Sequence, residues 1–473
     1  KARTGPNGLE GVDVKKPIGL YGVLKPKLDQ GQVVLLLPIA DEDTFLKFLD
    51  GLNMKAEKGK DGVYTLQPEG VPFPLLFRFA GGYLHGTVQF NPKVTLPAAS
   101  ALLKPETVLA DGAGMASLTV NLDQVPAQLR KLAVSSSVLA LNGAKEKELP
   151  GATEKQKELR DAIVDEAGEL FKTLLEDGTA LRLQVDVDQK SHDLTAQFSL
   201  AGKAGSKLAS DIGGLALGQG LAAAVLSKES AMGGAIHLTL PEAIRKAMVP
   251  AVDEAIAKKL DDLEAAHREA LTPLVKALTP TAHAGKLDAA VDVRGPIKGG
   301  KYTFVAALRV EKGQAIEKAF KDLIDQVPAD ARGKLKVDEA RVGDVNIHKL
   351  SQDLDANARE LFGDVPLYFA LRDDALLVAF GADGLATLKQ TVQAKPAVVA
   401  PVQTRLALGR MAPLMAKTEK AATDAAKQAF TTRGSDVVSL SVRGGSDLKV
   451  QFRVKTAVLT FASLLDKSRK EKE

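Results

Sequence analysis

The chain has 473 residues, more than one hydrophobic core usually serves, so two or more core units are expected. Hydrophobic residues make up 45% and charged residues 26%, a composition that argues against wholesale disorder. The 63 basic and 59 acidic residues are interspersed, and aromatic residues are only 4%, so a nucleic-acid partner is not indicated. Cysteine is absent, which excludes disulfides, thiolate nucleophiles and cysteine-based metal sites.

The first segment, residues 1–110, has an order of elements that recurs later in the chain. Two strands separated by a turn are followed by a helix that begins after acidic residues, then a short strand, a hairpin that turns at Gly81-Gly82, and a small helix. The expected ranges are 17–24, 32–38, 41–52, 63–66, 74–89 and 96–103. Strand, turn, strand, helix and hairpin together indicate one unit of α+β structure.

A second kind of unit is predicted in the segments 111–213 and 214–285. In the first of them a strand at 116–122, a long helix at 154–175 and a hairpin at 180–200 precede a helix at 207–212. In the second, a strand at 235–240 is followed by long helices up to residue 278. The glycine- and alanine-rich tract 213–234 has two interpretations: a closely packed connector, or a mobile apolar segment that contacts lipid or a partner.

The segment 286–396 matches the first segment closely enough to be aligned by eye. Strands flank the turn 295–300, and apolar residues at three- and four-residue spacings predict a helix over 313–327. The aligned pairs are Pro74 with Pro366, Phe77 with Phe369, Phe79 with Leu371, and Leu84 with Leu376. An internal duplication is the economical explanation.

The last segment, 397–473, is predicted to be a third unit with a long helix. A strand at 404–410 precedes one helix over 411–430, a strand pair at 437–455, and a helix that ends in a basic tail. The complete pattern predicts the α+β class, with duplicated strand, hairpin and helix units that form antiparallel sheets covered on one face by amphipathic helices. Alternation along the hairpin strands indicates that one sheet face is buried and the other is polar or wet.

The search for chemistry finds no catalytic or cofactor-binding motif. The six histidines form no HExxH or His-x-His pattern, and no GxSxG elbow, GxxxxGK[ST] loop or GxGxxG after a buried strand occurs. One hairpin tip is a weak candidate for a metal ion, because it gathers oxygen and nitrogen ligands without matching the calcium loop. Its residues are Asp186, Asp188, His192 and Asp193. No catalytic residue and no cofactor are predicted.

Targeting signals give an expectation about export. No run of about 18 apolar residues is present, so no transmembrane segment is expected. The chain begins at Lys1, without an initiator methionine, so a processed or truncated N-terminus is expected. The segments 16–24 and 34–45 resemble the opening of uncharacterised exported proteins found in planctomycete-type bacteria, and the hairpin 366–380 is similar to theirs. This resemblance implies a periplasmic or extracellular location and no established activity.

Three functional hypotheses remain. The leading one is a non-catalytic exported binding or scaffolding protein whose α+β surface meets a partner, a ligand or a second copy. The second is a carrier of apolar molecules between sheet and helices. The third is a hydrolase whose carboxylates are assembled in space, since the separation of such a pair leaves no trace in the sequence.

Overall fold

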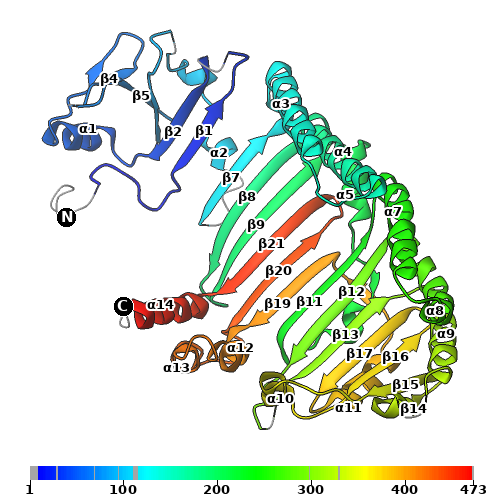
Figure 1. The fold of residues 1–473 in the computed structure, drawn as a ribbon. Helices are drawn as coiled ribbons and strands as arrows, with labels where there is room; N and C mark the ends of the chain where they lie inside the picture. Colours follow the sequence, from blue (N-terminus) through cyan, green and yellow to red (C-terminus); the bar gives the residue numbers. More distant parts are fainter. Residues whose placement is uncertain are drawn as a thin grey trace. The chain divides into compact units, whose positions relative to one another are not determined.

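The structure is a computed structural model that describes residues 9–27, 30–68, 70–93, 95–109, 115–297, 299–328 and 331–470. The chain divides into two compact units, residues 1–117 with 124–133, and residues 118–123 with 134–473. Helices and antiparallel strands are mixed in both, which confirms the predicted α+β class. Each unit is described by itself below, and its elements can be followed in Figure 1.

The first unit is built on a six-stranded sheet with the strand order β1-β2-β6-β5-β4-β3. Its elements are β1 (Gly19–Val23), β2 (Gln32–Pro38), α1 (Glu42–Gly51), β3 (Glu57–Lys58), β4 (Tyr64–Leu66), β5 (Leu75–Ala80), β6 (Tyr83–Val88) and α2 (Pro105–Leu109). Helix α1 begins at an N-cap, Asp41, whose side chain accepts a hydrogen bond from the Thr44 amide at 2.6 Å. Phe45 and Leu49 of α1 pack on Phe77 and Leu84 of the sheet.

The second unit contains a 13-stranded antiparallel sheet in the part of the chain that the structure describes. Its strand order is β14-β15-β16-β17-β13-β12-β11-β19-β20-β21-β9-β8-β7. The strands are β7 (Ala116–Asn121), β8 (Gly178–Asp188), β9 (Asp193–Gly202), β11 (Ser230–Thr239), β12 (Lys286–Arg294), β13 (Thr303–Arg309), β14 (Leu335–Val342), β15 (Val345–Leu350), β16 (Leu367–Arg372), β17 (Ala375–Gly381), β19 (Val402–Ala407), β20 (Val437–Arg443) and β21 (Asp447–Lys455). The segments predicted at 111–213, 214–285, 286–396 and 397–473 therefore all contribute strands to one sheet.

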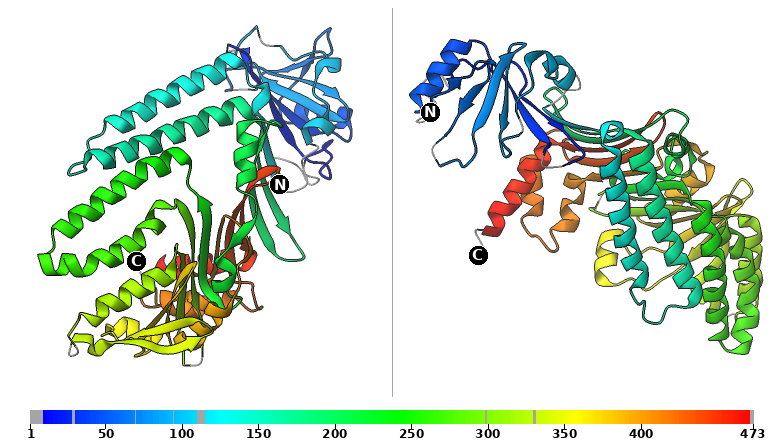
Figure 2. Two further views of the ribbon diagram at one scale, coloured as in Figure 1. Left: turned by 90° about the vertical axis from the view of Figure 1, so that its right-hand side faces the viewer. Right: turned by 90° about the horizontal axis from the view of Figure 1, so that it is seen from above.

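The helices of this unit gather at the two ends of the strands (Figures 1 and 2). Near one end lie residues 134–146 of α3 (Ala127–Glu146), together with α4 (Glu154–Asp177), α5 (Lys207–Gly214), α7 (Glu242–Asp261), α8 (Ala265–His283) and α9 (Gly313–Asp325). Near the other lie α12 (Leu408–Met415), α13 (Ala422–Ala429) and α14 (Thr456–Lys470). The remaining elements are β10 (Gly218–Gly220), α6 (Ala222–Val225), α10 (Ala356–Phe362), α11 (Gly384–Gln393) and β18 (Ala397–Val399).

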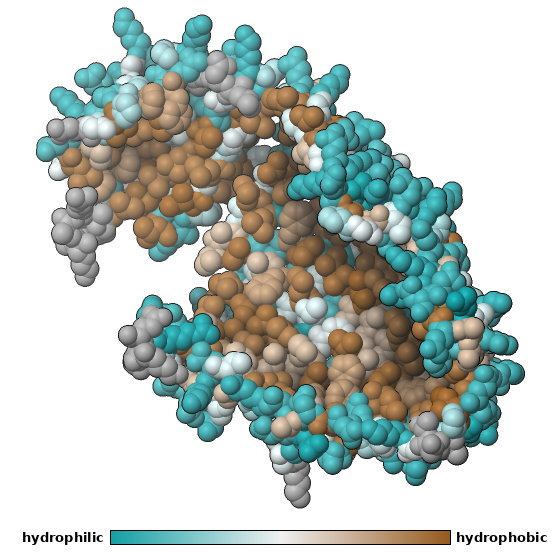
Figure 3. All heavy atoms as spheres, viewed as in Figure 1, coloured by the Kyte–Doolittle hydropathy of each residue, from teal (hydrophilic) through white to brown (hydrophobic). Residues whose placement is uncertain are grey.

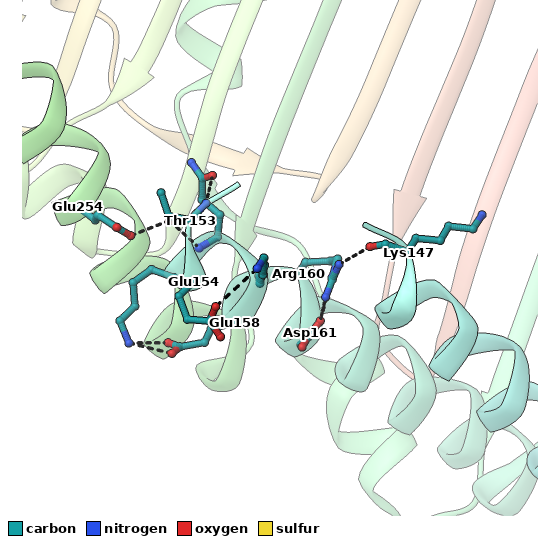
Figure 4. A network of polar contacts seen from close by, with 10 residues as sticks. Lys147, Thr153, Glu154, Glu158, Arg160, Asp161 and Glu254 are labelled. Carbon is teal, nitrogen blue, oxygen red and sulfur yellow. Dashed lines mark hydrogen bonds and ion pairs between the residues drawn. The ribbon is translucent and has the colours of Figure 1, made fainter. Parts of the chain in front are cut away.

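Polar contacts fasten the long helices to one another (Figure 4). Thr153 caps α4 in a capping box with Gln156, and its hydroxyl donates to Glu254 Oε2 of α7 at 2.7 Å. Arg160 of α4 donates to the carbonyl of Lys147 at 2.8 Å, just beyond the end of α3. These bonds link α4 to α7 and to the end of α3, although none of these helices has a large buried face of its own.

The main core of the second unit lies on one face of β12, β13, β16 and β17. Helices α6 and α11 cover this face, and the cluster includes Val225, Val305, Leu377 and Leu388. Helix α9 covers the other face at β16, where Ile316 packs on Leu371. At this end the sheet is therefore covered on both sides.

The predicted helix over 411–430 is wrong, because the chain forms two helices there. Helix α12 ends at Met415 and α13 begins at Ala422. The break lets alanines of both helices, Ala412, Ala422 and Ala426 among them, pack against Phe461 of α14. One straight helix would carry part of this alanine surface away from α14.

Candidate apolar binding face

Eight central strands of the large sheet, from β8 to β13, turn hydrophobic side chains to one side. The antiparallel register aligns them in rows across the sheet. One row is Leu183, Phe198, Val450, Val442, Val402, Ile236, Ala289 and Leu308. The next is Val185, Ala196, Phe452, Leu440, Thr404, Gly234, Val291 and Ala306. A third is Val187, Leu194, Val454, Val438, Leu406, Met232, Val293 and Phe304. We call these three rows the apolar face.

Many large side chains of the apolar face are exposed. Leu183 is 42% exposed, Phe452 44% and Val291 43%, although each lies in the middle of a strand. Figure 3 shows a hollowed hydrophobic surface over the strands of this sheet. Sequence alternation predicts an apolar face that helices bury, but the helices stand at the ends of the strands and leave this part of the face open.

The opposite face of the same strands is polar between β8 and β20. Its side chains include Arg182, Gln184, Gln197, Ser199, Lys449, Gln451, Ser439 and Ser441. The prediction of one polar face is therefore met on these strands, and the two faces differ sharply. Exposed hydrophobic surface of this extent usually marks a binding surface.

A polar cluster lies between helix α9 and the strands β14 and β15. Glu317 Oε1 is 3.5 Å from His348 Nε2, and Asp338 Oδ1 is 3.8 Å from His348 Nδ1. Ligand atoms of these three residues lie within 4.8 Å of one another, and no other such group of three is found in the described ranges. The Lys321 ammonium, however, contacts Glu317 at 2.8 Å and Asp338 at 2.9 Å. The cluster thus already contains a cation between its carboxylates.

His348 is fully buried in this cluster against aromatic rings. Its ring lies 4.9 Å from that of Phe369 and 5.7 Å from that of Phe320. Burial lowers the pKa of His348, while the charges of Glu317 and Asp338 oppose that shift. The residues come from one helix and two strands, so their sequence positions gave no signal that they meet.

At the tip of the β8–β9 hairpin, where a cation site is predicted, carboxylate oxygens already have partners within the protein. Asp188 Oδ1 accepts from the amides of Lys190 at 2.8 Å and Ser191 at 3.2 Å. The Ser191 side chain lowers the pKa of Asp188 most, and these two amides lower it further. Asp193 pairs with Lys455 at 3.0 Å. Asp188 and Asp193 face each other in the register, and His192 forms the turn with a φ of 56°. A metal ion at this tip, with Asp186 as a further ligand, stays a prediction.

Within the glycine- and alanine-rich tract 213–234, the segment 220–225 packs tightly against the core, whereas residues such as Leu217 are exposed. Leu221, Ala222 and Val225 are at most 2% exposed within the main core. A Cβ on Gly220 would lie 2.8 Å from Val399 and 3.0 Å from His237, so this close approach requires glycine. Of the two interpretations of the tract, close packing is the one these contacts support.

Two buried acids lie on the packed side of β12, Asp288 and Asp292. Asp288 accepts from the Leu221 amide at 3.1 Å and lies 3.3 Å from His237. Asp292 pairs with Arg294 at 3.1 Å, and burial raises the pKa of Asp292 against the effects of Ser230 and Arg294. Their oxygens fasten α6 and its flanking loops to the sheet, which is a structural use of carboxylates and offers no support for a hydrolase.

Comparisons with known proteins give no relative from which a function could be transferred. No protein-family model matches the chain, and neither the curated proteins nor the solved structures contain a match. Within the described ranges, none of the helices has the length and hydrophobicity needed to cross a bilayer. What defines the class of this molecule is its geometry, an α+β chain with a broad, exposed hydrophobic sheet face.

Proposed function

We propose that this protein is a non-catalytic binding protein that holds molecules with long hydrocarbon chains on the apolar face. The observation that supports the proposal is the exposure of large hydrophobic side chains on β8, β21, β11, β12 and β13 of this face. The reverse face is polar between β8 and β20 and is already buried in the main core at β12 and β13. A sheet needs only one buried face to be stable, so an exposed apolar face is a cost that bound hydrocarbon would remove.

The side chains of the apolar face favour hydrocarbon over a protein partner. Across its three rows the only polar side chain is Thr404. Protein interfaces usually carry about one hydrogen bond per 100–200 Å² and a polar rim. Methylene groups need no hydrogen bonds, and their burial is favourable by about 0.8 kcal/mol each. The resemblance to exported proteins adds the proposal that binding occurs in the periplasm or at the cell surface.

Bound molecules can be sought directly in purified protein. Native mass spectrometry, followed by organic extraction, is expected to find acyl-chain molecules that leave on delipidation. Titration of the delipidated protein with fatty acids of increasing length is expected to show a roughly fourfold gain in affinity for each added CH₂, until the chain exceeds the face.

A pair of neighbouring substitutions separates the two faces of the sheet. Phe452→Glu places a charge on the apolar face, whereas Gln451→Glu places it on the polar face one residue away. We expect the first to weaken binding about tenfold or more and the second to change it less than about twofold. Equal effects of the two variants, or a delipidated protein that binds no fatty acid, would refute the proposal. A lipid-free dimer in light scattering would assign the face to a second copy instead.

A further inference from the structure

A cleft of about 760 Å³ lies between β19, α12 and α13, next to the loops 226–229 and 430–436. Arg405 and Ala407 of β19 line it, and they alternate with Thr404 and Leu406, which belong to the apolar face. The cleft is therefore on the other side of this strand, and it is independent of the function proposed above. Its volume is typical of sites for small organic ligands.

Positive charge dominates the cleft. Its cationic residues are Lys228, Arg405, Arg410, Lys427 and Arg433. Asp436 is the one acid among its described lining residues, and its carboxylate already accepts from the Gly409 amide at 3.2 Å. The surplus of cations indicates an anionic ligand.

The arginines converge on a carboxylate at the edge of the cleft. Arg410 donates to Glu229 Oε2 at 2.6 Å, and Arg433 donates to Glu229 Oε1 at 3.3 Å. The hydrogen bond from Arg410 lowers the pKa of Glu229, and the charges of Arg410, Arg433 and Arg405 lower it further. Guanidinium groups in this place thus already bind one oxyanion of the chain itself.

Two cations of the cleft have no such partner. In the described part of the chain, neither Lys228 nor Arg405 forms an ion pair or a side-chain hydrogen bond, and Arg405 Nε is buried without an acceptor. The Lys228 and Arg405 side chains line the cleft, so their charges are left for an oxyanion bound there.

We propose that the cleft binds a phosphate group carried by an organic molecule. Guanidinium groups donate to phosphate oxygens in pairs, and Lys228 would add a point charge. Ala412, Ala426 and Phe430 give the cleft an apolar wall for the organic part of the ligand. Free phosphate esters and phospholipid headgroups share this chemistry.

Binding is tested on the full-length protein with four probes. Inorganic phosphate and glycerol 3-phosphate are titrated by calorimetry, and vesicles of phosphatidylcholine with and without phosphatidic acid are used in sedimentation. Arg405→Gln and Lys228→Gln are each expected to reduce the affinity about tenfold or more. Lys449→Gln removes the same charge from β21, outside the cleft, and is expected to change it less than about twofold.

The outcomes either identify the kind of molecule that carries the phosphate group or refute the proposal. Binding of glycerol 3-phosphate assigns a soluble ester, and binding of phosphatidic acid vesicles alone assigns a lipid headgroup. Binding of none of the four probes overturns the proposal, as does a loss for Lys449→Gln as large as for Arg405→Gln. Phe452→Glu is expected to leave phosphate binding unchanged, so failure of the apolar-face proposal is distinguishable. Circular dichroism verifies folding, and Lys228→Gln, in a loop, is the variant to use if Arg405→Gln unfolds.

Discussion

Two regions of the molecule, β1 to β6 and β12 to β17, have the same arrangement of strands. The first has the order β1-β2-β6-β5-β4-β3, and the second has β12-β13-β17-β16-β15-β14 within the larger sheet. In both, a helix that starts four residues after the second strand packs on the sheet, α1 in the first and α9 in the second. The equal topology fits an internal duplication, which itself stays a prediction.

The cores of the two regions differ in chemistry at equivalent positions. Tyr64 stacks on Phe77 with ring centres 5.0 Å apart, and His348 lies on Phe369 at 4.9 Å. Both pairs join the same two strands at the same register. The second region adds a buried carboxylate next to this ring, with an ammonium paired to it, whereas in the first region the Lys58 ammonium lies over the Tyr64 ring, 5.3 Å from its centre. One arrangement of strands therefore tolerates either an aromatic or a polar interior, provided that each polar group has a partner.

The positions of the equivalent strands β1 and β12 in their sheets explain why only the large sheet has a broad apolar face. β1 ends the small sheet, whereas β12 pairs with β11, and six further strands follow β11 in the large sheet. Leu20 and Val33 of the first region are 65% and 62% exposed, and their register equivalents, Val291 and Phe304, belong to the apolar face. The same hydrophobic positions are thus a small patch in one unit and part of an extended surface in the other.

The largest difference between the regions is expected at the start of the helix. A Cβ on Gly313 would lie 1.9 Å from the Arg372 carbonyl oxygen, whereas the equivalent residue in α1, Glu42, is exposed. Gly313→Ala is therefore expected to destabilise the second unit by about 3 kcal/mol, and Glu42→Ala to cost about 0.5 kcal/mol. Unfolding in urea, monitored by hydrogen exchange, measures the loss of stability for each variant. Similar losses for the two variants would contradict the close contact at the start of α9.

A smaller effect is expected from the cation that pairs with the buried carboxylate of the second region. Lys321→Met leaves the nearly buried Glu317 carboxylate with the Asn346 amide, 2.9 Å away, and without its ammonium partner. A loss of about 2 kcal/mol is expected. Lys318→Met, which breaks an exposed pair with Asp322, is the control and should cost less than about 0.5 kcal/mol. Equal urea midpoints for the two variants would show that the cluster does not stabilise the fold.

The smallest effect concerns pH and the buried histidines, His85 in the first region and His348 in the second. Burial lowers the pKa of both below the ordinary 6.5, so the unfolded chain binds more protons in mildly acidic solution. The contribution of each neutral, buried histidine to stability is therefore fully present above pH 6.5. It is lost as the pH falls below 6.5 toward the lowered pKa of the folded state. Burial is opposed at both sites, by the Ala80 backbone at His85 and by the charges of Glu317 and Asp338 at His348, so both units are expected to lose stability in mildly acidic solution.

Replacing His85 by the residue at the equivalent position of the second region isolates the contribution of this histidine to the pH dependence of stability. Leu377 occupies the position of His85 in the second region and is likewise buried. His85→Leu should flatten the pH dependence of the first unit between pH 7 and pH 5, and hydrogen exchange of β5 and β6 measures it. If those strands stay as acid-sensitive as before, His85 is not the group that titrates.

The amino-acid pattern by itself determined the local elements and their class. Alternation along 180–188 and 447–455 predicted strands with one apolar and one polar side, and the spacing over 313–327 predicted the helix α9. The alignment of Phe77 with Phe369 agrees with the register of the two hairpins. These features depend on neighbours in the chain, so they can be read along it.

Only the tertiary structure decided what each apolar side faces. Periodicity is the same whether a hydrophobic face is covered by helices or left exposed, so the exposure of Phe452 and Val291 had no sequence signal. The same holds for the cluster of Glu317 with His348 and for the cleft at Arg405, because residues far apart in the chain meet there. Local pattern fixes which side of an element is apolar, and long-range packing fixes what lies against that side.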